Sequence, residues 1–204
     1  MSKTTNEHED EIFQYVSRKD IEKKRKKKEK SLGCELFSLF IYFVFVIAIS
    51  YVIVTFVGQR TQVSGSSMYP TLHNEDNLII DKISYRFNDP ERFDIVVFEY
   101  LGEPGTHYVK RIIGLPGETV QIKDSVIYIN GEPLEENYGA EAILAAERAG
   151  EPITLGEDEY FVLGDNRNHS KDSRSYEVGN VNKSQIIGKV WIRIWPLSSF
   201  GKVE

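Results

Sequence analysis

The sequence has few of the residues that build disulfides and metal centres. Its 204 residues include one cysteine, Cys34, and four scattered histidines. A single cysteine excludes an intramolecular disulfide, so a folded domain in this chain must be stabilised by its own apolar core. Cys/His clusters with the spacing of a zinc site are missing too. We therefore expect neither a metal nor another cofactor.

Charge is missing from one long stretch, residues 36–57, which contains no Asp, Glu, Lys or Arg. As a helix it would be ~33 Å long, enough to cross a hydrocarbon core of ~30 Å. Phe, Val and Ile occur all round it, which argues against an amphipathic surface helix. It is also longer than the apolar core of a cleaved signal peptide, about 7–15 residues. We predict a transmembrane helix over 36–57.

Positive charge is concentrated before this span. Residues 1–30 carry 10 Lys/Arg and 7 Asp/Glu, a net charge of +3. Because the whole chain has a net charge of −6, residues 31–204 have a net charge of −9. Such a run could bind nucleic acid or be solvated. Because a basic segment next to a span stays in the cytoplasm, we expect residues 1–35 to be a cytoplasmic tail that contacts anionic lipid. We expect no nucleic-acid binding, and residues 58–204 should be extracytoplasmic.

Beyond the span, short segments rich in Val, Ile, Tyr and Phe indicate β-strands. They cover residues 78–80, 93–98, 106–113, 119–122, 126–129, 159–163 and 189–194. Turn residues separate them: Pro116-Gly117 suits a type II turn and Asn130-Gly131 suits a hairpin. Without regular helical alternation, this pattern predicts a mainly β, antiparallel domain. Residues 132–158 interrupt it as an acidic excursion, which we expect to be exposed, with a short helix over 140–149.

A small cluster of serines follows the span, and one of them could be a nucleophile. The candidates are Ser64, Ser66 and Ser67. Pro70 restricts the backbone of the residue before it, and Gly65 would let a substrate backbone approach closely. A serine hydroxyl is a weak nucleophile without an adjacent base. On composition alone, an ordinary polar turn after a membrane anchor is the favoured interpretation.

Lys110 is a candidate base because it lies within an apolar strand segment. Strand alternation puts Lys110 and Arg111 on opposite faces, so one can point inward while the other faces water. Burial lowers the pKa of a lysine from ~10.4, and the neutral amine can then accept a proton. A structural cation at the sheet edge is the alternative. His169, in the polar segment 164–174, is a second candidate base.

Three segments in this order resemble the bacterial type I signal peptidases: Ser67-Met-Tyr-Pro-Thr-Leu, Tyr108-Val-Lys-Arg-Ile-Ile-Gly-Leu-Pro-Gly-Glu and Gly164-Asp-Asn-Arg-Asn-His-Ser-Lys-Asp-Ser-Arg. The resemblance covers roughly residues 63–131 and 159–196. It implies one N-terminal transmembrane helix followed by an antiparallel β-sheet catalytic domain of the signal peptidase type. The implied activity is a serine endopeptidase that removes signal peptides from exported preproteins, cutting after small residues, without a cofactor. We expect a monomer in the cell membrane.

The resemblance also assigns roles to particular residues. It implies that Ser67 is the nucleophile, that Lys110 is the general base, and that the hydroxyl of Ser170 orients the lysine amine. Asp172 matches the acidic position of the last segment, and we expect it to pair with Arg174.

Asp165 and Arg167 fall on the same segment, where the resemblance implies structural roles. Two positions depart from the family pattern. Gly65 stands where relatives carry a serine whose hydroxyl donates a hydrogen bond in the oxyanion hole. The sequence therefore does not identify the second oxyanion-hole donor of this chain. Phe93 stands where many relatives have glycine, so we expect different local packing.

Two other classes of protein share some of these features. A self-cleaving repressor-type protease has the same Ser–Lys chemistry, but it has a DNA-binding domain and no membrane span. A non-enzymatic, membrane-anchored β module could bind partners through segment 164–174. Ser67 lies ten positions after Val57, which favours an enzyme near the lipid surface, because this stretch reaches only ~33–36 Å when extended.

Overall fold

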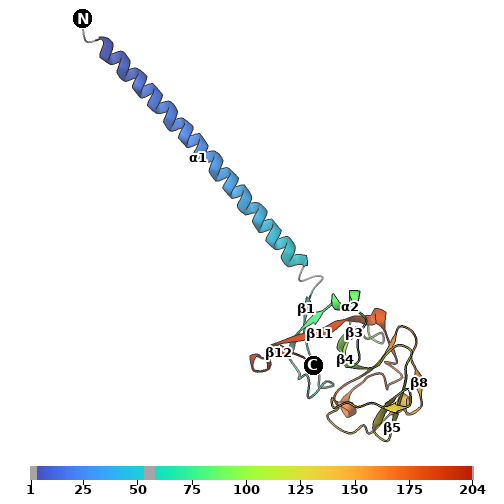
Figure 1. Cartoon of the computed structure of the whole chain (residues 1–204). Helices are drawn as coiled ribbons and strands as arrows, with labels where there is room; N and C mark the ends of the chain where they lie inside the picture. The colour runs from blue at the N-terminus through green and yellow to red at the C-terminus, as the bar shows by residue number, and fades with distance from the viewer. Residues whose placement is uncertain (1–3, 53–57, 204) are drawn as a thin grey trace. The chain divides into compact units, whose positions relative to one another are not determined.

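The computed structural model describes residues 4–52 and 58–203 and divides the chain into two units, between Val52 and Ile53 (Figure 1). The first unit is one continuous helix, α1, Thr4–Val52. Its stretch Gly33–Tyr51 is 19 residues long with a mean hydropathy of 2.1, long and apolar enough to cross a membrane. The predicted span continues to Val57, but residues 53–57 lie outside the described residues. The helix includes the basic segment, because Lys, Arg and Glu favour helix.

The second unit is built on an eight-stranded sheet in which every pairing is antiparallel. The strand order is β1-β2-β11-β3-β4-β9-β10, and β12 also pairs with β11. The strands are β1 (Gly58–Gln62), β2 (Asn77–Asp81), β3 (Ile95–Glu99), β4 (His107–Gly114), β9 (Glu159–Leu163), β10 (Val181–Asn182), β11 (Ile186–Trp195) and β12 (Gly201–Lys202). The predicted mainly β, antiparallel fold is confirmed.

A smaller sheet of four strands has the order β7-β6-β5-β8. Its members are β5 (Thr119–Lys123), β6 (Val126–Ile129), β7 (Glu132–Pro133) and β8 (Ile153–Thr154). Five short helical turns complete the described part of this unit: α2 (Ser84–Phe87), η2 (Glu147–Gly150), η3 (Arg167–His169), η4 (Lys183–Gln185) and η5 (Leu197–Ser199). The predicted turns agree with positive φ angles of 78° at Gly117 and 86° at Gly131.

The structure corrects the prediction for the excursion 132–158. The expected helix over 140–149 is not formed; a single 3-10 turn, η2, occurs at its end. Backbone groups of this segment bond to other parts of the chain instead, as Ala140 N does to Asp165 O. Nor is the excursion fully exposed, because Ile143, Ala149 and Leu155 are buried in an apolar cluster with β5 and β9. Apolar burial in that cluster explains why the segment follows the domain surface.

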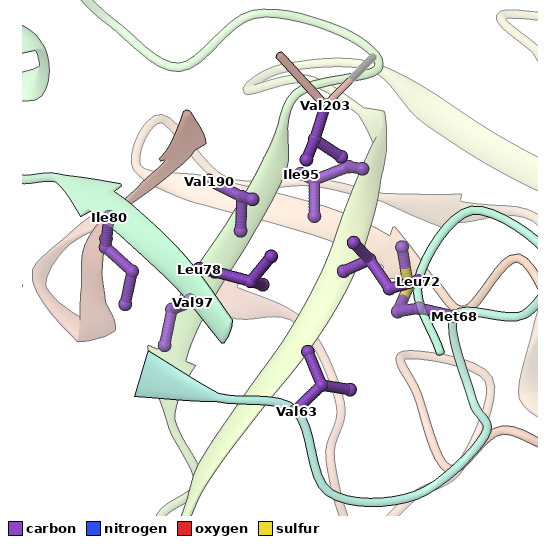
Figure 2. Packing of buried hydrophobic residues seen from close by; sticks show 9 residues of the cluster. All are labelled: Val63, Met68, Leu72, Leu78, Ile80, Ile95, Val97, Val190 and Val203. Carbon is purple, nitrogen blue, oxygen red and sulfur yellow. The ribbon is translucent and has the colours of Figure 1, made fainter. Parts of the chain in front are cut away.

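The serine loop, residues 63–76 between β1 and β2, is attached to another apolar cluster. Met68 and Leu72 of the loop are 2% and 0% exposed, and Figure 2 shows their side chains among those of the sheet. The cluster consists of Val63, Met68, Leu72, Leu78, Ile80, Ile95, Val97, Val190 and Val203. Leu72 N also donates to Met68 O at 2.8 Å. Core packing of Met68 and Leu72 therefore fixes the backbone of the neighbouring Ser67 from one side.

Candidate active site

The serine loop and strand β4 bring one hydroxyl and one amine together. Lys110 Nζ lies 2.7 Å from Ser67 Oγ and 2.9 Å from the carbonyl oxygen of Val109. Ser67 is partly exposed, whereas Ser64 and Ser66 are exposed. Of the three candidate serines, Ser67 is thus the one that contacts a buried base. A hydroxyl within hydrogen-bond distance of an amine has the geometry needed for proton transfer.

Lys110 is 3% exposed, and this burial changes its acidity. Loss of hydration lowers the pKa of Lys110 to about 8, while the negative charges of Asp172 and Asp165 act in the opposite direction. The ring of Tyr108 lies beside the amine, with its centroid 5.2 Å from Nζ. The amine therefore has a substantial neutral fraction near pH 8, and a neutral amine can act as a base.

Lys110 and its neighbour Arg111 are both buried, contrary to the prediction that one of them faces water. Arg111 is 1% exposed because Asp165 compensates its charge in a bidentate pair, with Nε–Oδ1 and Nη2–Oδ2 distances of 2.9 and 2.8 Å. Its Nη1 also donates to the carbonyl oxygen of Phe93. Both faces of strand β4 are covered, because Ile112 is buried in one apolar cluster and Ile113 in another. A paired guanidinium can be buried at such a position, whereas an unpaired one could not.

The polar loop, residues 164–174 after β9, contains a second buried ion pair. Asp172 and Arg174 form it through Oδ1–Nε and Oδ2–Nη2 contacts of 2.8 and 2.9 Å. Asp172 Oδ2 also accepts a hydrogen bond from Gly164 N at 3.1 Å. The pair therefore connects the two ends of the polar loop. These bonds are charge-assisted and geometrically specific, which favours one loop conformation.

Three hydrogen bonds join the polar loop to the serine loop. Asn166 N donates to Ser67 O at 3.0 Å, and Asn166 Nδ2 donates to Ser66 O at 3.1 Å. Thr71 Oγ1 donates to Asp165 Oδ2 at 2.5 Å. Asn166 thus binds the carbonyl oxygens of both Ser66 and Ser67. Together with the packing of the serine loop on the core, these bonds define the position of Ser67.

Gly164 approaches the site so closely that only a glycine fits. A Cβ atom at this position would lie 2.4 Å from Ser67 O and 2.2 Å from Ser170 Oγ. Ser170 is therefore close to the serine loop, but its buried hydroxyl has no hydrogen-bond partner within the part of the chain that the structure describes. Its orienting role stays a prediction. His169 is exposed, and the bond to Ser67 Oγ comes from Lys110.

The two departures from the family pattern also have a structural context. Gly65 has a φ of 98°, a backbone conformation that favours glycine, and it has no side-chain donor to offer. Phe93 has a φ of 72°, where a glycine would be unstrained. Its ring contacts Tyr138, with centroids 5.0 Å apart. Packing against Tyr138 gives a reason for an aromatic residue at this strained position.

Sequence reasoning did not single out four residues that the structure places at or near the site. Thr71, Gly164 and Asn166 lie inside the three characteristic segments, so the segments themselves were the available signal. Glu136 is different, because it lies in the excursion 132–158 and binds Arg167 across 31 positions in the sequence. Nothing in the local pattern around Glu136 indicates this contact.

The close approach of Gly164 gives the first testable prediction. Gly164→Ala should lower kcat by at least about 100-fold, because displacement of Ser67 by even ~1 Å is enough to disturb the reacting geometry. Cleavage rates of the purified full chain would measure this. Gly150→Ala is a matched control, since its Cβ would meet only Ala146 at 3.8 Å. Equal rates in the two variants would show that the approach at Gly164 does not position Ser67.

Comparison with known proteins identifies the family of this chain. Residues 36–195 match the family described as signal peptidase, peptidase S26. Probable signal peptidase I-2 of Synechocystis sp. is 44% identical over 72% of this chain and 67% of that protein. Signal peptidase I of Leptolyngbya laminosa is 42% identical over 73% of this chain and 74% of its own length. A solved signal peptidase I from Enterococcus faecalis is 38% identical and covers 50% of this chain and 97% of its own, with a TM-score of 0.42. This chain belongs to the signal peptidase family of serine peptidases, peptidase S26.

Proposed function

We propose that this chain is a membrane-anchored endopeptidase that removes N-terminal signal peptides from exported preproteins, with Ser67 as nucleophile and Lys110 as general base. The observation that carries the assignment is the 2.7 Å contact between Ser67 Oγ and the buried Nζ of Lys110. Membership of the family supports the reaction, since the relatives are named signal peptidase I. The lowered pKa of Lys110 supports the role of base.

The reaction proceeds through an acyl-enzyme. Neutral Lys110 accepts the hydroxyl proton as Ser67 Oγ attacks the carbonyl carbon of the scissile bond. The ammonium group then gives this proton to the leaving amine of the mature protein, and the C–N bond breaks. A water molecule, deprotonated by the same lysine, attacks the ester and releases the signal peptide with a new carboxylate. Ser67 recovers its proton from Lys110, so the enzyme ends unchanged.

The oxyanion of the tetrahedral intermediate requires donors close to Ser67. We assign the backbone N–H of Ser67 as one donor. Gly65 cannot supply a side-chain hydroxyl, and one donor is worth about 2.7–4 kcal/mol in comparable sites. A second donor in this chain must therefore come from a group other than the side chain at position 65.

Residues of the polar loop support the pair rather than react. Ser170 is proposed to orient the Lys110 amine, because its buried hydroxyl lies against Gly164, which also adjoins Ser67. Asp165 and Asp172 have two effects: they bind Arg111 and Arg174, and their negative charge limits the fall in the pKa of Lys110. The base thus keeps enough proton affinity to take a proton from serine.

The apolar part of α1 supports a membrane anchor, with the basic N-terminal segment in the cytoplasm and the β domain on the other side. Ser67 lies ten positions after Val57, which limits the reach of the site to ~33–36 Å from the end of the predicted span. A signal peptide still in the bilayer presents its cleavage point near the same surface. The anchor therefore keeps the site within reach of the cleavage point of the preprotein at the membrane surface. Small residues before the cut and extended binding at a sheet edge complete the proposed specificity.

Replacement of the pair tests the proposal. Ser67→Ala and Lys110→Met should each lower preprotein cleavage by at least ~1,000-fold, because neither partner works alone. The assay is incubation of the detergent-solubilised full chain with a preprotein, followed by mass measurement of the products. Ser66→Ala and His169→Ala are the controls and should retain activity. Substantial cleavage by folded Lys110→Met would refute the pair, and loss in His169→Ala would favour a Ser–His mechanism.

The pH dependence follows from the sign of the pKa change. Burial favours the neutral amine, so its pKa of about 8 lies below that of a hydrated lysine. Because the base must be neutral, kcat/KM should rise about tenfold per pH unit below pH 8 and level off above it. Initial rates between pH 6 and pH 10 would measure this profile, because kcat/KM should change by about 100-fold between pH 6 and pH 8. A midpoint at the ordinary lysine value of ~10.4 would contradict the assignment.

A further inference from the structure

Three arginines are buried around the site: Arg111, Arg167 and Arg174 are 1%, 2% and 2% exposed. A guanidinium stays charged in proteins, so each buried one requires a compensating carboxylate. The polar loop itself supplies two carboxylates, Asp165 for Arg111 and Asp172 for Arg174. It supplies none for Arg167.

The third carboxylate comes from Glu136 in the excursion 132–158. Arg167 Nη1 lies 2.7 Å from Glu136 Oε1, and Nη2 lies 2.8 Å from Oε2. The two side chains are 2% and 13% exposed, so this is a bidentate and nearly dry ion pair. Bidentate, charge-assisted pairs of this kind are geometrically specific. Glu136 therefore fixes the direction of the Arg167 side chain.

Arg167 transmits this constraint to the reacting serine through Gly164. Its Nε donates to the carbonyl oxygen of Gly164 at 3.1 Å. Gly164 lies directly against the carbonyl oxygen of Ser67 and the hydroxyl of Ser170, with no room for a Cβ atom. A shift of the Gly164 backbone therefore displaces Ser67 or Ser170. The path from Glu136 to the nucleophile has two intermediates and uses short contacts throughout.

A second path leads from Glu136 to the serine loop. Glu136 Oε2 accepts a hydrogen bond from Tyr138 N at 3.0 Å, and the ring of Tyr138 lies 3.7 Å from the guanidinium carbon of Arg111. Arg111 binds Asp165, whose carboxylate also accepts from Thr71 of the serine loop. Glu136 thus acts on two of the three arginines, one by charge and one through the aromatic ring that covers it.

We infer that Glu136 is a positioning residue for the Ser67–Lys110 pair, and that the excursion 132–158 serves catalysis by supplying it. The inference rests on the proposed function, because it assumes that Ser67 is the nucleophile. It assigns Glu136 no contact with substrate. Its effect is on the alignment of Ser67, which enters the chemical step rather than substrate binding.

The test compares Glu136→Gln with Glu141→Gln in the full chain. Glu141 is the matched control: it lies in the same excursion and bonds to the same loop through Asn168, at 3.0 Å, but from an exposed position. Glu136→Gln should lower kcat by about 10- to 100-fold with KM within about twofold of the wild type, the pattern of a group that acts in the transition state. Glu141→Gln should match the wild type in both constants. An unchanged kcat in Glu136→Gln, or a loss confined to KM, would overturn the inference.

A double-variant cycle distinguishes action through Arg167 from a general loss of stability. If Glu136 acts through Arg167, the double variant Glu136→Gln/Arg167→Met should have a kcat no lower than Arg167→Met alone. Multiplication of the two losses would overturn this path. The double variant also contains no uncompensated buried charge, so it tests the inference if Glu136→Gln alone fails to fold. In that case a kcat at least about 10-fold below wild type supports the inference, and wild-type kcat contradicts it.

The same experiment distinguishes this inference from the proposed function. If the wild type does not cleave a preprotein, or if Ser67→Ala cleaves it as well as the wild type does, the proposed function fails and the inference fails with it. If the wild type cleaves, Ser67→Ala does not, and Glu136→Gln keeps full kcat, only the positioning role of Glu136 is refuted.

Discussion

The proposed chemistry depends on one contact, that between the Ser67 hydroxyl and the amine of Lys110. The contact is chemically useful only when the amine is neutral, and the amine has a substantial neutral fraction near pH 8 only because it is buried. Burial in turn requires that β4 be an inner strand of the sheet, between β3 and β9, with apolar side chains on both of its faces. It also requires that the serine loop approach β4 closely, which the packing of Met68 and Leu72 provides. The contact between Ser67 and Lys110 therefore depends on both the sheet and the packed loop.

Charge compensation is the second constraint. Three buried arginines and three carboxylates surround the lysine as separate pairs: Arg111–Asp165, Arg174–Asp172 and Arg167–Glu136. Such pairs add little to stability compared with apolar side chains, but loss of one partner is strongly unfavourable. Their contribution here is geometric, since each pair binds a backbone segment that touches the serine loop or its neighbours. The excursion belongs to this arrangement because it supplies one of the six charges.

The parts of the fold that follow from local pattern could be predicted from the sequence. The apolar span follows from its length, and the longer strands follow from their Val, Ile and aromatic content. Strand β1 was missed because its five residues are polar, and β10 was missed because two residues carry little pattern. The expected helix over 140–149 was wrong, because its backbone groups find partners in the polar loop instead of in a helix. The composition of the segment does not show that hydrogen bonds to the polar loop replace those of a helix.

The same distinction applies to the site. Ser67 and Lys110 could be named from their segments, although they lie 43 positions apart in the chain. The burial of Arg111 could not, because it depends on Asp165, which is 54 positions away. Glu136 was also out of reach, since its partner is defined only by the fold. Ser67, Lys110 and the Asp172–Arg174 pair could thus be found from the characteristic segments, while the partners of Arg111 and Arg167 required the structure.

The proposed mechanism requires that burial next to Ser67 lower the pKa of the Lys110 amine to about 8. The most direct test is an NMR titration of the full chain carrying labelled lysine side chains, with the Lys110 signal assigned by its absence in Lys110→Met. The account predicts that this signal titrates with a midpoint of about 8, well below the signals of exposed lysines near ~10.4. A Lys110 signal that titrates together with the exposed lysines would contradict it.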